Sequence, residues 1–454
     1  MASWRPASPS SSAAPARRFT PFVVLETTAV LAGVANGITM VAFPWLVLET
    51  TGDATATATI AAVTALPLLL SMLFTGVVVD RLGRRPVAIV SDVLSMLSVV
   101  LVPVLAMTVG LQYGLLLLVA ALGAVFDPAG VTARETMLPE AARTAGLSLE
   151  RANGLHDGAY NIAFLIGPGL GGILVATIGT TTTFWATAAA FALSAILMAC
   201  TRMPGGARVR HSGEQHGLAK ATVEGLSFLW RDKLLRTMAV LGALLVGVWL
   251  PVEGVVLPYV FNEADQPGRL GLLITAMSAG GVVGALLYAA WGSRFPRRWA
   301  FVGSLILCAI PCVGLALLPP YPAMLLLGVL TGLFFGAVSP VNNLALQNRT
   351  PERLRGRVVG AMGSSAYAAG PIGYLVAGPL VDAWGPQPVL LLMTVSLLVV
   401  SIASAFLPSL ALLDAPPLPG SAGHPDHIVV GPDVRMVEAE MAAHVRDDEP
   451  QRAA

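Results

Sequence analysis

The chain has 454 residues, of which 55% are hydrophobic and only 12% are charged. Soluble domains carry about 25% charged residues, and the mean hydropathy here is +0.75. This composition excludes a water-soluble globule of this size and predicts a protein whose surface mostly faces a lipid bilayer. The net charge of +1 excludes nothing by itself, because the information lies in how the charges are distributed along the chain.

Residues 1–20 are rich in Ser, Pro and Ala, contain Arg17 and Arg18, and are predicted to be a disordered N-terminus. Twin arginines before an apolar run are also typical of export signals. The run that follows contains Glu26 and lacks a small-residue cleavage site, and at about 28 residues it is too long for a signal. We therefore expect it to be the first membrane-spanning helix.

Apolar stretches of about 20 residues, the length that crosses a bilayer, occur twelve times. The first six are 21–49, 55–79, 86–109, 112–133, 156–179 and 182–201. The second six are 235–260, 269–291, 299–318, 321–345, 357–381 and 387–411. The predicted fold is an all-α membrane protein with twelve transmembrane helices in two six-helix bundles, at 21–202 and 235–411.

The linker between the two sets, residues 203–234, is polar. Its later part places Val223, Leu226, Trp230 and Leu234 on roughly one helical face, which favours a helix lying along the membrane surface. Residues 412–454 contain Pro, Asp and Glu with weak periodicity and are predicted to form a mostly disordered tail.

Lysine and arginine are distributed asymmetrically over the connections between spans. Of the 27, 26 lie in, or within two residues of, the termini, the linker or even-numbered connections, and only Arg269 lies beside an odd-numbered one. Cytoplasmic loops of membrane proteins carry an excess of these residues. The sequence therefore predicts a multi-pass protein of the cell membrane with both termini and the linker in the cytoplasm.

The two sets of spans also repeat in sequence. Pro128 and Pro139 recur at a shift of about 212 residues as Pro340 and Pro351, and the arginines of the loop near 81–85 recur in the loop near 294–298. Such a repeat predicts two parallel six-helix halves with a binding site between them near the middle of the membrane.

A charged loop with a distinctive pattern follows the second predicted span. The pattern consists of Gly76, Asp80, Arg81, Gly83, Arg84 and Arg85. It resembles the signature loop between helices two and three of the major facilitator superfamily. Gly76 permits close helix approach, Gly83 a tight turn, and Asp80 can pair with arginines at the membrane rim. The resemblance implies a latch that holds the two halves in the outward-facing state, and the alternative is a positive loop that only fixes topology.

The fifth predicted span carries a run of small residues at fixed spacing. The run consists of Gly154, Gly167, Pro168, Gly171 and Gly172, with Ala163 where the similar antiporter signature of the superfamily has glycine. Small residues let helices pack closely, and a proline frees a backbone carbonyl. The two interpretations are antiporter-type bending of this helix and ordinary small-residue packing.

A wider resemblance, over about residues 20–410, is to bacterial exporters of drugs and secondary metabolites akin to the enterobactin exporter. The residues that carry it are PWLVL at 44–48, LPLLL at 66–70, PE at 139–140, RAN at 151–153 and EGL at 224–226. The resemblance implies a secondary transporter that works by alternating access, in which the two halves expose a central site to each side of the membrane in turn.

Ionisable residues inside spans cost about 2.5–3.5 kcal/mol each on insertion scales and are functional candidates. Glu253 lies between Pro251 and Gly254, where we expect a broken helix, and is the first candidate for a proton-coupling site. Glu26 and Asp127 either couple protons or bind substrate, or else lie hydrated at the rim. Asp92 is expected to play a structural role by pairing with the arginines at 81–85.

Neutral polar residues in the spans are candidates for the cavity wall or for contacts between helices, among them Asn36, Asn161 and Asn342. The three cysteines are interpreted as small core residues. There is no phosphate-binding loop, no dinucleotide turn and no cluster with metal-ligand spacing, so neither a cofactor nor a metal is expected, and an enzyme has no support.

The predicted function is proton-coupled export of small amphipathic molecules, such as a drug, an antibiotic or a siderophore-like compound. The expected partners are the substrate, protons and the lipid bilayer, with no nucleic acid, and the protein is expected to be a monomer. The alternatives are a proton-independent facilitator or importer, and a sensor that has kept the fold without moving solute.

Overall fold

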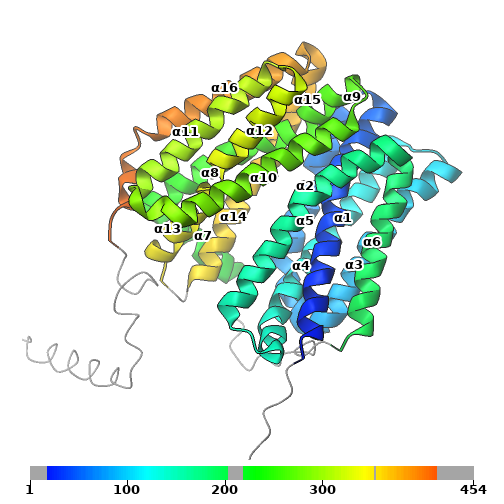
Figure 1. Ribbon diagram of the computed structural model, residues 1–454, viewed down its shortest axis with the longest axis horizontal. Helices are drawn as coiled ribbons and strands as arrows, with labels where there is room; N and C mark the ends of the chain where they lie inside the picture. The colour runs from blue at the N-terminus through cyan, green and yellow to red at the C-terminus, as the bar shows by residue number, and fades with distance from the viewer. Residues whose placement is uncertain (1–17, 203–217, 352–353, 417–454) are drawn as a thin grey trace, which may run out of the picture.

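The computed structural model describes residues 18–202, 218–351 and 354–416, which are almost entirely helical (Figure 1). The first half comprises α1 (Thr20–Thr51), α2 (Ala54–Leu82), α3 (Arg84–Thr108), α4 (Tyr113–Ala145), α5 (Leu149–Ile178) and α6 (Thr180–Cys200). Helix α7 (Leu218–Arg231) follows in the linker. The predicted disordered segments, 1–17 of the N-terminus and 417–454 of the tail, lie outside the described residues, as does 203–217 of the linker.

The second half contains several helical rods that are interrupted or kinked. It comprises α8 (Lys233–Pro251) with η1 (Val252–Val256) and α9 (Leu257–Glu263), then α10 (Pro267–Trp291), η2 (Gly292–Arg294), α11 (Arg297–Ala316), α12 (Tyr321–Phe335) with α13 (Val338–Arg349), α14 (Arg355–Tyr367) with α15 (Gly370–Trp384), α16 (Pro386–Ser404) and η4 (Pro408–Leu413). In the described residues, ten helical spans are long and apolar enough to cross a membrane. Together with α2 and the α14–α15 rod they make the six plus six predicted.

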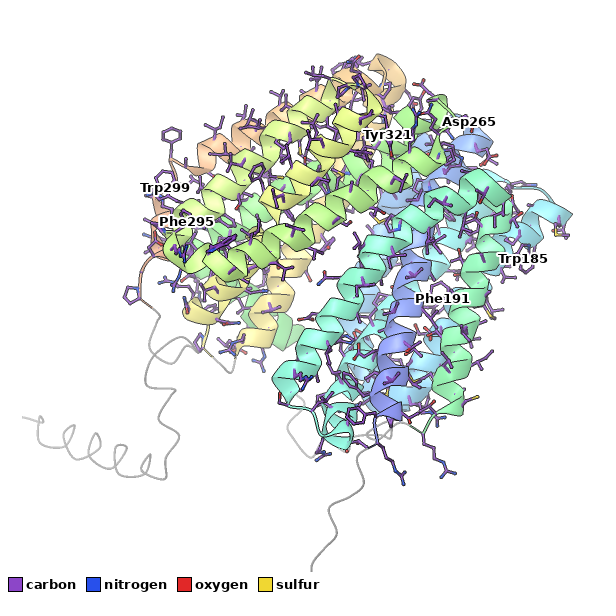
Figure 2. All side chains as sticks on the ribbon, viewed as in Figure 1. Trp185, Phe191, Asp265, Phe295, Trp299 and Tyr321 are labelled. Atoms are coloured by element: carbon purple, nitrogen blue, oxygen red, sulfur yellow. The ribbon has the colours of Figure 1, made fainter. Side chains whose placement is uncertain are left out.

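Exposed aromatic residues lie near the ends of the helices. Trp185 near the start of α6, Phe295 just before α11 and Trp299 in the first turn of α11 are 45%, 62% and 57% exposed (Figure 2). Tryptophan and tyrosine gather at the boundary between hydrocarbon and headgroups, and a large aromatic side chain in water would be costly. This pattern fits a bundle that stands upright in a bilayer.

The two halves meet at one end of the molecule and separate at the other (Figure 1). We call the end at which α1 begins the terminus end, and the end at which α1 turns into α2 at Gly52 the opposite end. Between halves, α5 packs against α10, α2 against α15, and α1 against α9. In the α2–α15 contact, Asp382 of α15 accepts hydrogen bonds from the backbone N–H groups of Ala54 (3.0 Å) and Thr55 (2.8 Å) at the start of α2.

The electrostatics of Asp382 favour that contact. This residue lies just beyond the predicted span 357–381, at the opposite end. Burial raises the pKa of its carboxyl, but hydrogen bonds from Thr55 and Ala54 outweigh that effect and hold the pKa below its usual value. The carboxylate also sits at the N-terminus of α2, where the helix dipole favours negative charge.

Helix α7 attaches the linker to the second half. Glu224 forms an ion pair with Arg357 of α14, and Gly225 packs so closely on the Arg357 backbone that a Cβ would lie 2.5 Å from its carbonyl oxygen. Of the predicted interfacial face, Val223, Leu226 and Trp230 are exposed. Leu234 is buried instead, because it belongs to α8, which starts in a different direction after Asp232.

Helix α4 extends well beyond the predicted span 112–133, to Ala145. Arg134, which the charge count assigns to a loop, therefore lies inside a helix and is only 3% exposed. The expectation that Asp92 pairs with the arginines at 81–85 is wrong. Asp92 binds Arg134, with both carboxylate oxygens 2.5 Å from the same guanidinium nitrogen, because α3 and α4 pack side by side.

Candidate functional site

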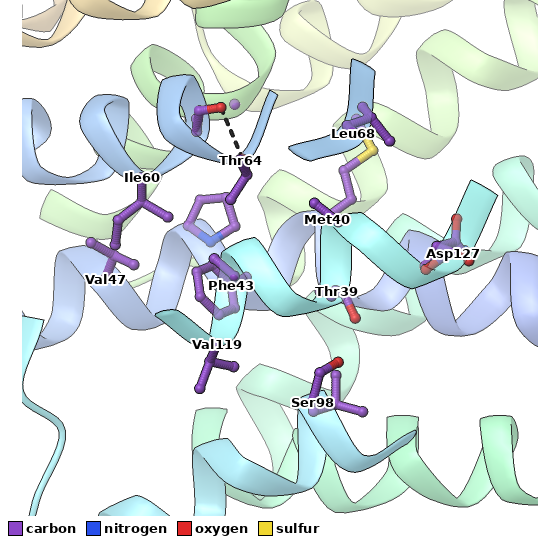
Figure 3. A pocket seen from close by; sticks show the side chains of 18 of the residues that line it. Thr39, Met40, Phe43, Val47, Ile60, Thr64, Leu68, Ser98, Val119 and Asp127 are labelled. Carbon is purple, nitrogen blue, oxygen red and sulfur yellow. Dashed lines mark hydrogen bonds between the residues drawn. The ribbon is translucent and has the colours of Figure 1, made fainter. Parts of the chain in front are cut away.

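A cavity of about 440 Å³ lies between the halves (Figure 3). Its wall comes from α1 to α4 and α6 of the first half, and from α8, η1 and α15 of the second. Most of the lining is apolar, with side chains such as Met40, Phe43 and Leu250. Among the described lining residues, Asp127 and Glu253 carry carboxyl groups and none is a lysine or arginine. The two carboxyl groups come from different halves, and sites of such transporters lie where the two repeats meet.

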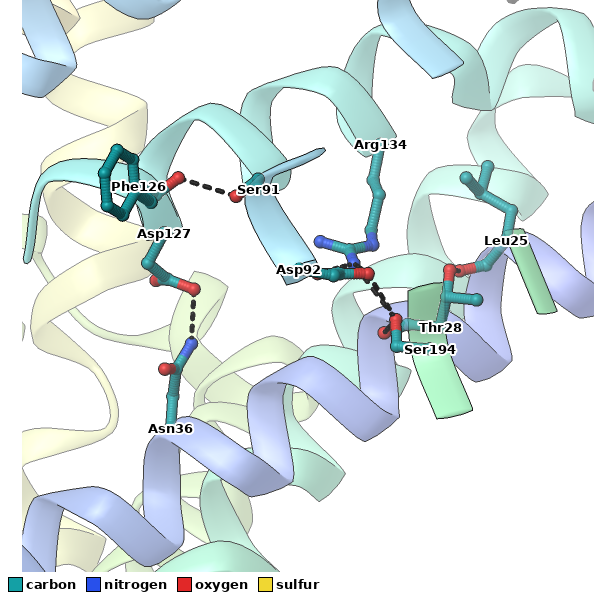
Figure 4. A network of polar contacts seen from close by, with 9 residues as sticks. All are labelled: Leu25, Thr28, Asn36, Ser91, Asp92, Phe126, Asp127, Arg134 and Ser194. Carbon is teal, nitrogen blue, oxygen red and sulfur yellow. Dashed lines mark hydrogen bonds and ion pairs between the residues drawn. The ribbon is translucent and has the colours of Figure 1, made fainter. Parts of the chain in front are cut away.

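Asp127 is held in the cavity wall by the predicted polar residue Asn36. The Asn36 side-chain amide donates to Asp127 Oδ1 at 2.7 Å, joining α1 to α4 (Figure 4). Pro128 lacks a backbone N–H, so the preceding turn of α4 is loosened. Ser71 of α2 and Ser91 of α3 bind carbonyl oxygens in that turn, those of Val125 (2.5 Å) and Phe126 (2.6 Å). The sequence alone did not single out these serines.

Glu253 lies in a π-helical turn, Val252–Val256. The expectation of a broken helix is wrong here, because α8, η1 and α9 run on as one rod from Lys233 to Glu263. A π turn absorbs the proline at 251 by widening the helix instead of ending it, and such turns often occur at functional positions. The indole N–H of Trp249 donates to Glu253 Oε2 at 3.1 Å, and Tyr374 of α15 lines the cavity nearby.

Glu26 lies one to two turns from the start of α1, outside the wall of the central cavity. Its carboxylate oxygens are 3.0 and 3.2 Å from Nδ1 of His156 on α5. Sequence reasoning missed His156, because residues 149–155 were assigned to a connection and α5 in fact begins at Leu149. An unexplained histidine at the first residue of the predicted span 156–179 was the available signal.

The buried pair of Asp92 and Arg134 ties three helices together (Figure 4). Ser194 of α6 donates to Asp92 at 2.7 Å, and Arg134 donates to Ser194 at 3.1 Å. All three side chains are essentially buried. A buried charge pair of this kind holds elements in register, and removal of one partner is far more costly than replacement of both.

The charged signature loop lies at the terminus end. Gly83 joins α2 to α3 with φ of 95°, a conformation that favours glycine. Arg85 donates to the carbonyl oxygens of Met198 and Ala199 at the end of α6 (3.2 and 2.5 Å), Arg84 is half-buried and Arg81 is exposed. Gly76 and Asp80 belong to α2, but the surroundings of these two residues lie outside what the structure describes.

The small residues of α5 form its contact with α1. Gly167 packs on Gly37, where a Cβ on either glycine would lie 2.7 Å from the Cα of the other. One turn further along α5, a Cβ on Gly171 would lie 2.8 Å from the carbonyl oxygen of Ile38. Ala163, the departure from the antiporter-like pattern, packs directly on Gly33. Gly154 has no atom within 4 Å of its Cβ position.

The same stretch of α5 contacts the other half at the opposite end. A Cβ on Gly172 would lie 2.4 Å from the carbonyl oxygen of Pro267 and 2.9 Å from the Cα of Gly271, both on α10. Thr275 of α10 donates to the carbonyl oxygen of Leu165 at 3.0 Å, in the turn that Pro168 loosens. The run of small residues therefore packs α5 between α1 and α10, and its glycines form part of the contact between halves.

The other predicted polar residues lie elsewhere. Asn161 is exposed on α5, and Asn342 is half-buried on α13; neither lines the central cavity. Cys308 and Cys312 are buried core residues, whereas Cys200 is exposed at the end of α6, against expectation.

Comparison with known proteins gives concordant results. The family model described as Major Facilitator Superfamily matches residues 26–263 and 254–435. The chain is 42% identical over 397 residues to the multidrug efflux pump Tap of Mycolicibacterium fortuitum, covering 87% of this chain and 97% of that protein. It is 41% identical over 399 residues to Tap of Mycobacterium tuberculosis, covering 87% and 95%.

Solved structures with similar folds include a mutant of the nucleoside transporter NupG, with a TM-score of 0.72 at 12% identity, covering 85% of this chain and 99% of that one. A bacterial homolog of the lysosomal transporter Spinster, in an inward-facing and unoccupied conformation, has a TM-score of 0.68 at 14% identity, with coverage of 89% and 100%. At such identities these structures show the fold alone. The family model and the Tap relatives confirm the resemblance inferred from the charged loop, and this chain belongs to the major facilitator superfamily of membrane transporters.

Proposed function

We propose that this protein exports small amphipathic molecules from the cytoplasm in exchange for protons. The observation that carries the proposal is the cavity between the halves, whose wall is mostly apolar and holds one carboxyl group from each half, Asp127 and Glu253. An apolar wall with a few polar groups accepts varied amphipathic molecules, and a carboxyl group facing a cavity can bind a proton or a cation. The name of the Tap relatives, multidrug efflux pumps, supports the same substrate class.

We infer that the terminus end faces the cytoplasm of a cell membrane. Support comes from the signature loop with Arg81 and the linker helix α7, since cytoplasmic connections carry the excess of lysine and arginine. On this inference the closed opposite end faces outward and the conformation is an inward-facing one, and we expect the transporter to be a monomer in the lipid bilayer. The loop at 76–85 is proposed to latch the terminus end when the halves rock into the outward-facing state.

In the proposed cycle, a carboxyl group takes a proton from outside, the substrate leaves, and the proton is released inward after the halves rock back. One charge crossing 100 mV supplies about 2.3 kcal/mol, and one pH unit supplies about 1.4 kcal/mol. One proton per cycle can therefore sustain roughly a several-hundredfold gradient of a neutral substrate.

Glu253 is the proposed coupling residue. The test compares Glu253→Gln, Glu26→Gln and Asp127→Asn in proteoliposomes, with the fluorescent lipophilic cation ethidium as the probe. One assay measures exchange of ethidium down its own gradient, and the other measures accumulation driven by an imposed pH gradient. Glu253→Gln keeps shape and hydrogen bonding but cannot ionise, so exchange should persist while pH-driven accumulation disappears.

The changes at Glu26 and Asp127 should reduce accumulation less. If Glu253→Gln still accumulates ethidium and one of the others does not, the coupling residue is wrongly assigned. If all three variants accumulate it, these carboxyl groups do not couple transport to protons, and a proton-independent facilitator becomes the better interpretation.

A further inference from the structure

A second, smaller cavity lies beside the central one inside the first half. It measures about 110 Å³, and Asn36 and Asp127 line both cavities. From Asp127 it extends past Arg134 and Tyr160 to His156. The 110 Å³ cavity therefore connects a carboxyl group of the central cavity with the Glu26–His156 pair near the start of α1 and α5.

We propose that the Glu26–His156 pair is a proton-release site, through which a proton from the central cavity reaches the cytoplasm. The proposal rests on the proton-coupled export argued above. It does not depend on whether Asp127 or Glu253 first binds the proton, because both line the central cavity.

The small cavity is suited to hold water. A single water needs about 10–15 Å³ and two to four polar partners, and 110 Å³ with polar groups on three helices meets both needs. Arg134 is 3% exposed, and its Nε finds no hydrogen-bond partner among the described residues. An unpaired buried N–H costs about 1–3 kcal/mol, so a water in this cavity would be stabilised. Direct transfer from Asp127 to His156 is not required.

The bond between Glu26 and Nδ1 determines how His156 would act. With Nδ1–H directed at the carboxylate, Nε2 is the ring nitrogen free to accept a proton. Both side chains are largely enclosed, 12% exposed for His156 and 14% for Glu26. The carboxylate stabilises the imidazolium that forms, as an acidic partner does for histidine in acid–base catalysis.

Charged neighbours complete the route to solvent. The groups that face His156 are Glu26 from α1, Arg134 and Glu135 from α4, and Asp157 and Tyr160 from α5 itself. Among the residues described in α6 there is no charged side chain, and Arg269 of α10 lies at the opposite end. Glu135 and Asp157 are exposed, so they provide acceptors between the enclosed pair and bulk water.

The step moves a proton and nothing else. A proton given up by the coupling carboxyl group of the central cavity passes to a water of the 110 Å³ cavity beside Asp127, and that water passes a proton to Nε2 of His156. The resulting imidazolium then gives up a proton to solvent past Glu135 or Asp157. The coupling carboxyl group ends as a carboxylate, and His156 returns to its neutral form.

The experiment uses everted membrane vesicles, in which the cytoplasmic face is outside and its pH is set by the buffer. Ethidium accumulation and ethidium exchange are measured for wild type, His156→Gln and Glu26→Gln. The control is Glu140→Gln, which removes a carboxylate from an exposed ion pair with Arg143 on the same side of the first half.

In His156→Gln the side-chain amide can still bond to Glu26 but cannot shuttle a proton. We expect its pH-driven accumulation to fall at least about tenfold, a small part of the 10²–10⁴-fold that a positioned proton-transfer group contributes. Exchange should stay within about twofold of wild type. With the pH difference across the membrane held constant, accumulation by wild type should fall as the buffer is acidified from about pH 8 to about pH 6, where histidine titrates, and His156→Gln should lose this dependence.

In Glu26→Gln, pH-driven accumulation should decrease less than in His156→Gln, and its dependence on buffer pH should differ from that of wild type. Glu140→Gln should match wild type in both respects. Accumulation and a pH profile equal to wild type in both His156→Gln and Glu26→Gln would overturn the proton-release site and leave proton-coupled export standing. Loss of exchange together with accumulation in both variants would also overturn it, since the pair would then be a structural contact. Wild-type vesicles that exchange ethidium without pH-driven accumulation would refute the proposed function itself.

Discussion

Addition of one methyl group at Gly172 should shift the protein away from the conformation described here. In this conformation a Cβ at Gly172 would lie 2.4 Å from the carbonyl oxygen of Pro267 and 2.9 Å from the Cα of Gly271. Both atoms belong to the backbone of α10, so no flexible side chain can yield. Helices α5 and α10 would have to separate by about 1 Å to reach ordinary van der Waals contact.

Overpacking of this kind costs about 1–3 kcal/mol, which is about a 5- to 150-fold change in an equilibrium constant. The cost falls on the state in which the opposite end is closed, because α5 and α10 come apart there in the proposed rocking of the halves. The higher helix propensity of alanine favours both states alike and cancels. Gly172→Ala should therefore populate the state with an open opposite end.

The assay uses double electron–electron resonance to measure the distance between two spin labels, one at Thr177 on α5 and one at Asp265 before α10. Both positions are exposed at the opposite end. Gly172→Ala should move the distance distribution toward longer values. Gly154→Ala is the matched control, because it lies on the same helix and in the same sequence pattern but has no atom within 4 Å of its Cβ position. An unchanged distribution in Gly172→Ala, or an equal change in Gly154→Ala, would refute the reasoning.

Two further predictions concern charged groups. Asp92→Ala leaves Arg134 buried without its partner and should lower the free energy of unfolding by about 3–5 kcal/mol, which thermal unfolding would show as a large drop in the midpoint temperature. The double variant Asp92→Asn with Arg134→Gln should recover much of this stability. Equal stability of wild type and Asp92→Ala would contradict the prediction. The contact between Asp382 and the start of α2 should persist above about pH 4, because the pKa of the Asp382 carboxyl is lowered. The stabilisation from this contact is fully present above the usual carboxyl pKa, and it is lost only as the pH falls through the lowered pKa. The distance between the spin labels at Thr177 and Asp265 should thus stay constant from about pH 8 to about pH 5 in wild type. Asp382→Asn should weaken the contact at every pH by about 1 kcal/mol or less, since the Asp382 side chain is exposed.

The fold was predictable from the sequence because the bilayer imposes simple rules on length and charge. Twelve apolar stretches of spanning length and the one-sided lysine and arginine count need no knowledge of which helices touch. The rules fail where polar residues continue a helix beyond the hydrocarbon. Arg134 falls in such an extension of α4 and was therefore assigned to a connection. His156 stood at the very edge of its predicted span, because α5 in fact begins at Leu149.

The candidate site was predictable only in part, because pairings depend on tertiary contact. Asp127 and Glu253 stand out as rare charges beside prolines, and both line the cavity. The partner of Asp92 lies 42 residues away on α4, and nothing in the local pattern separates that arginine from those at 81–85. The glycines of α5 indicate close packing, but the identity of the facing helix is decided by how the halves dock.

Both cavity carboxyl groups lie where a proline disturbs a helix, Asp127 directly before Pro128 and Glu253 in the π turn after Pro251. A proline removes one backbone hydrogen bond and leaves neighbouring carbonyl groups to be satisfied by side chains. In α4 serines from α2 and α3 meet that need. The distorted turn is thus fixed by the surrounding helices, and the carboxyl group it carries keeps a defined place in the cavity wall.

The two halves place their carboxyl groups by different local structures, a loosened α-helical turn in the first half and a π turn in the second. Their carboxyl groups therefore have different surroundings, with an amide donor at Asp127 and an indole donor at Glu253. Under the proposed exchange of substrate for protons, two such groups on one cavity allow the proton and the substrate to bind in turn.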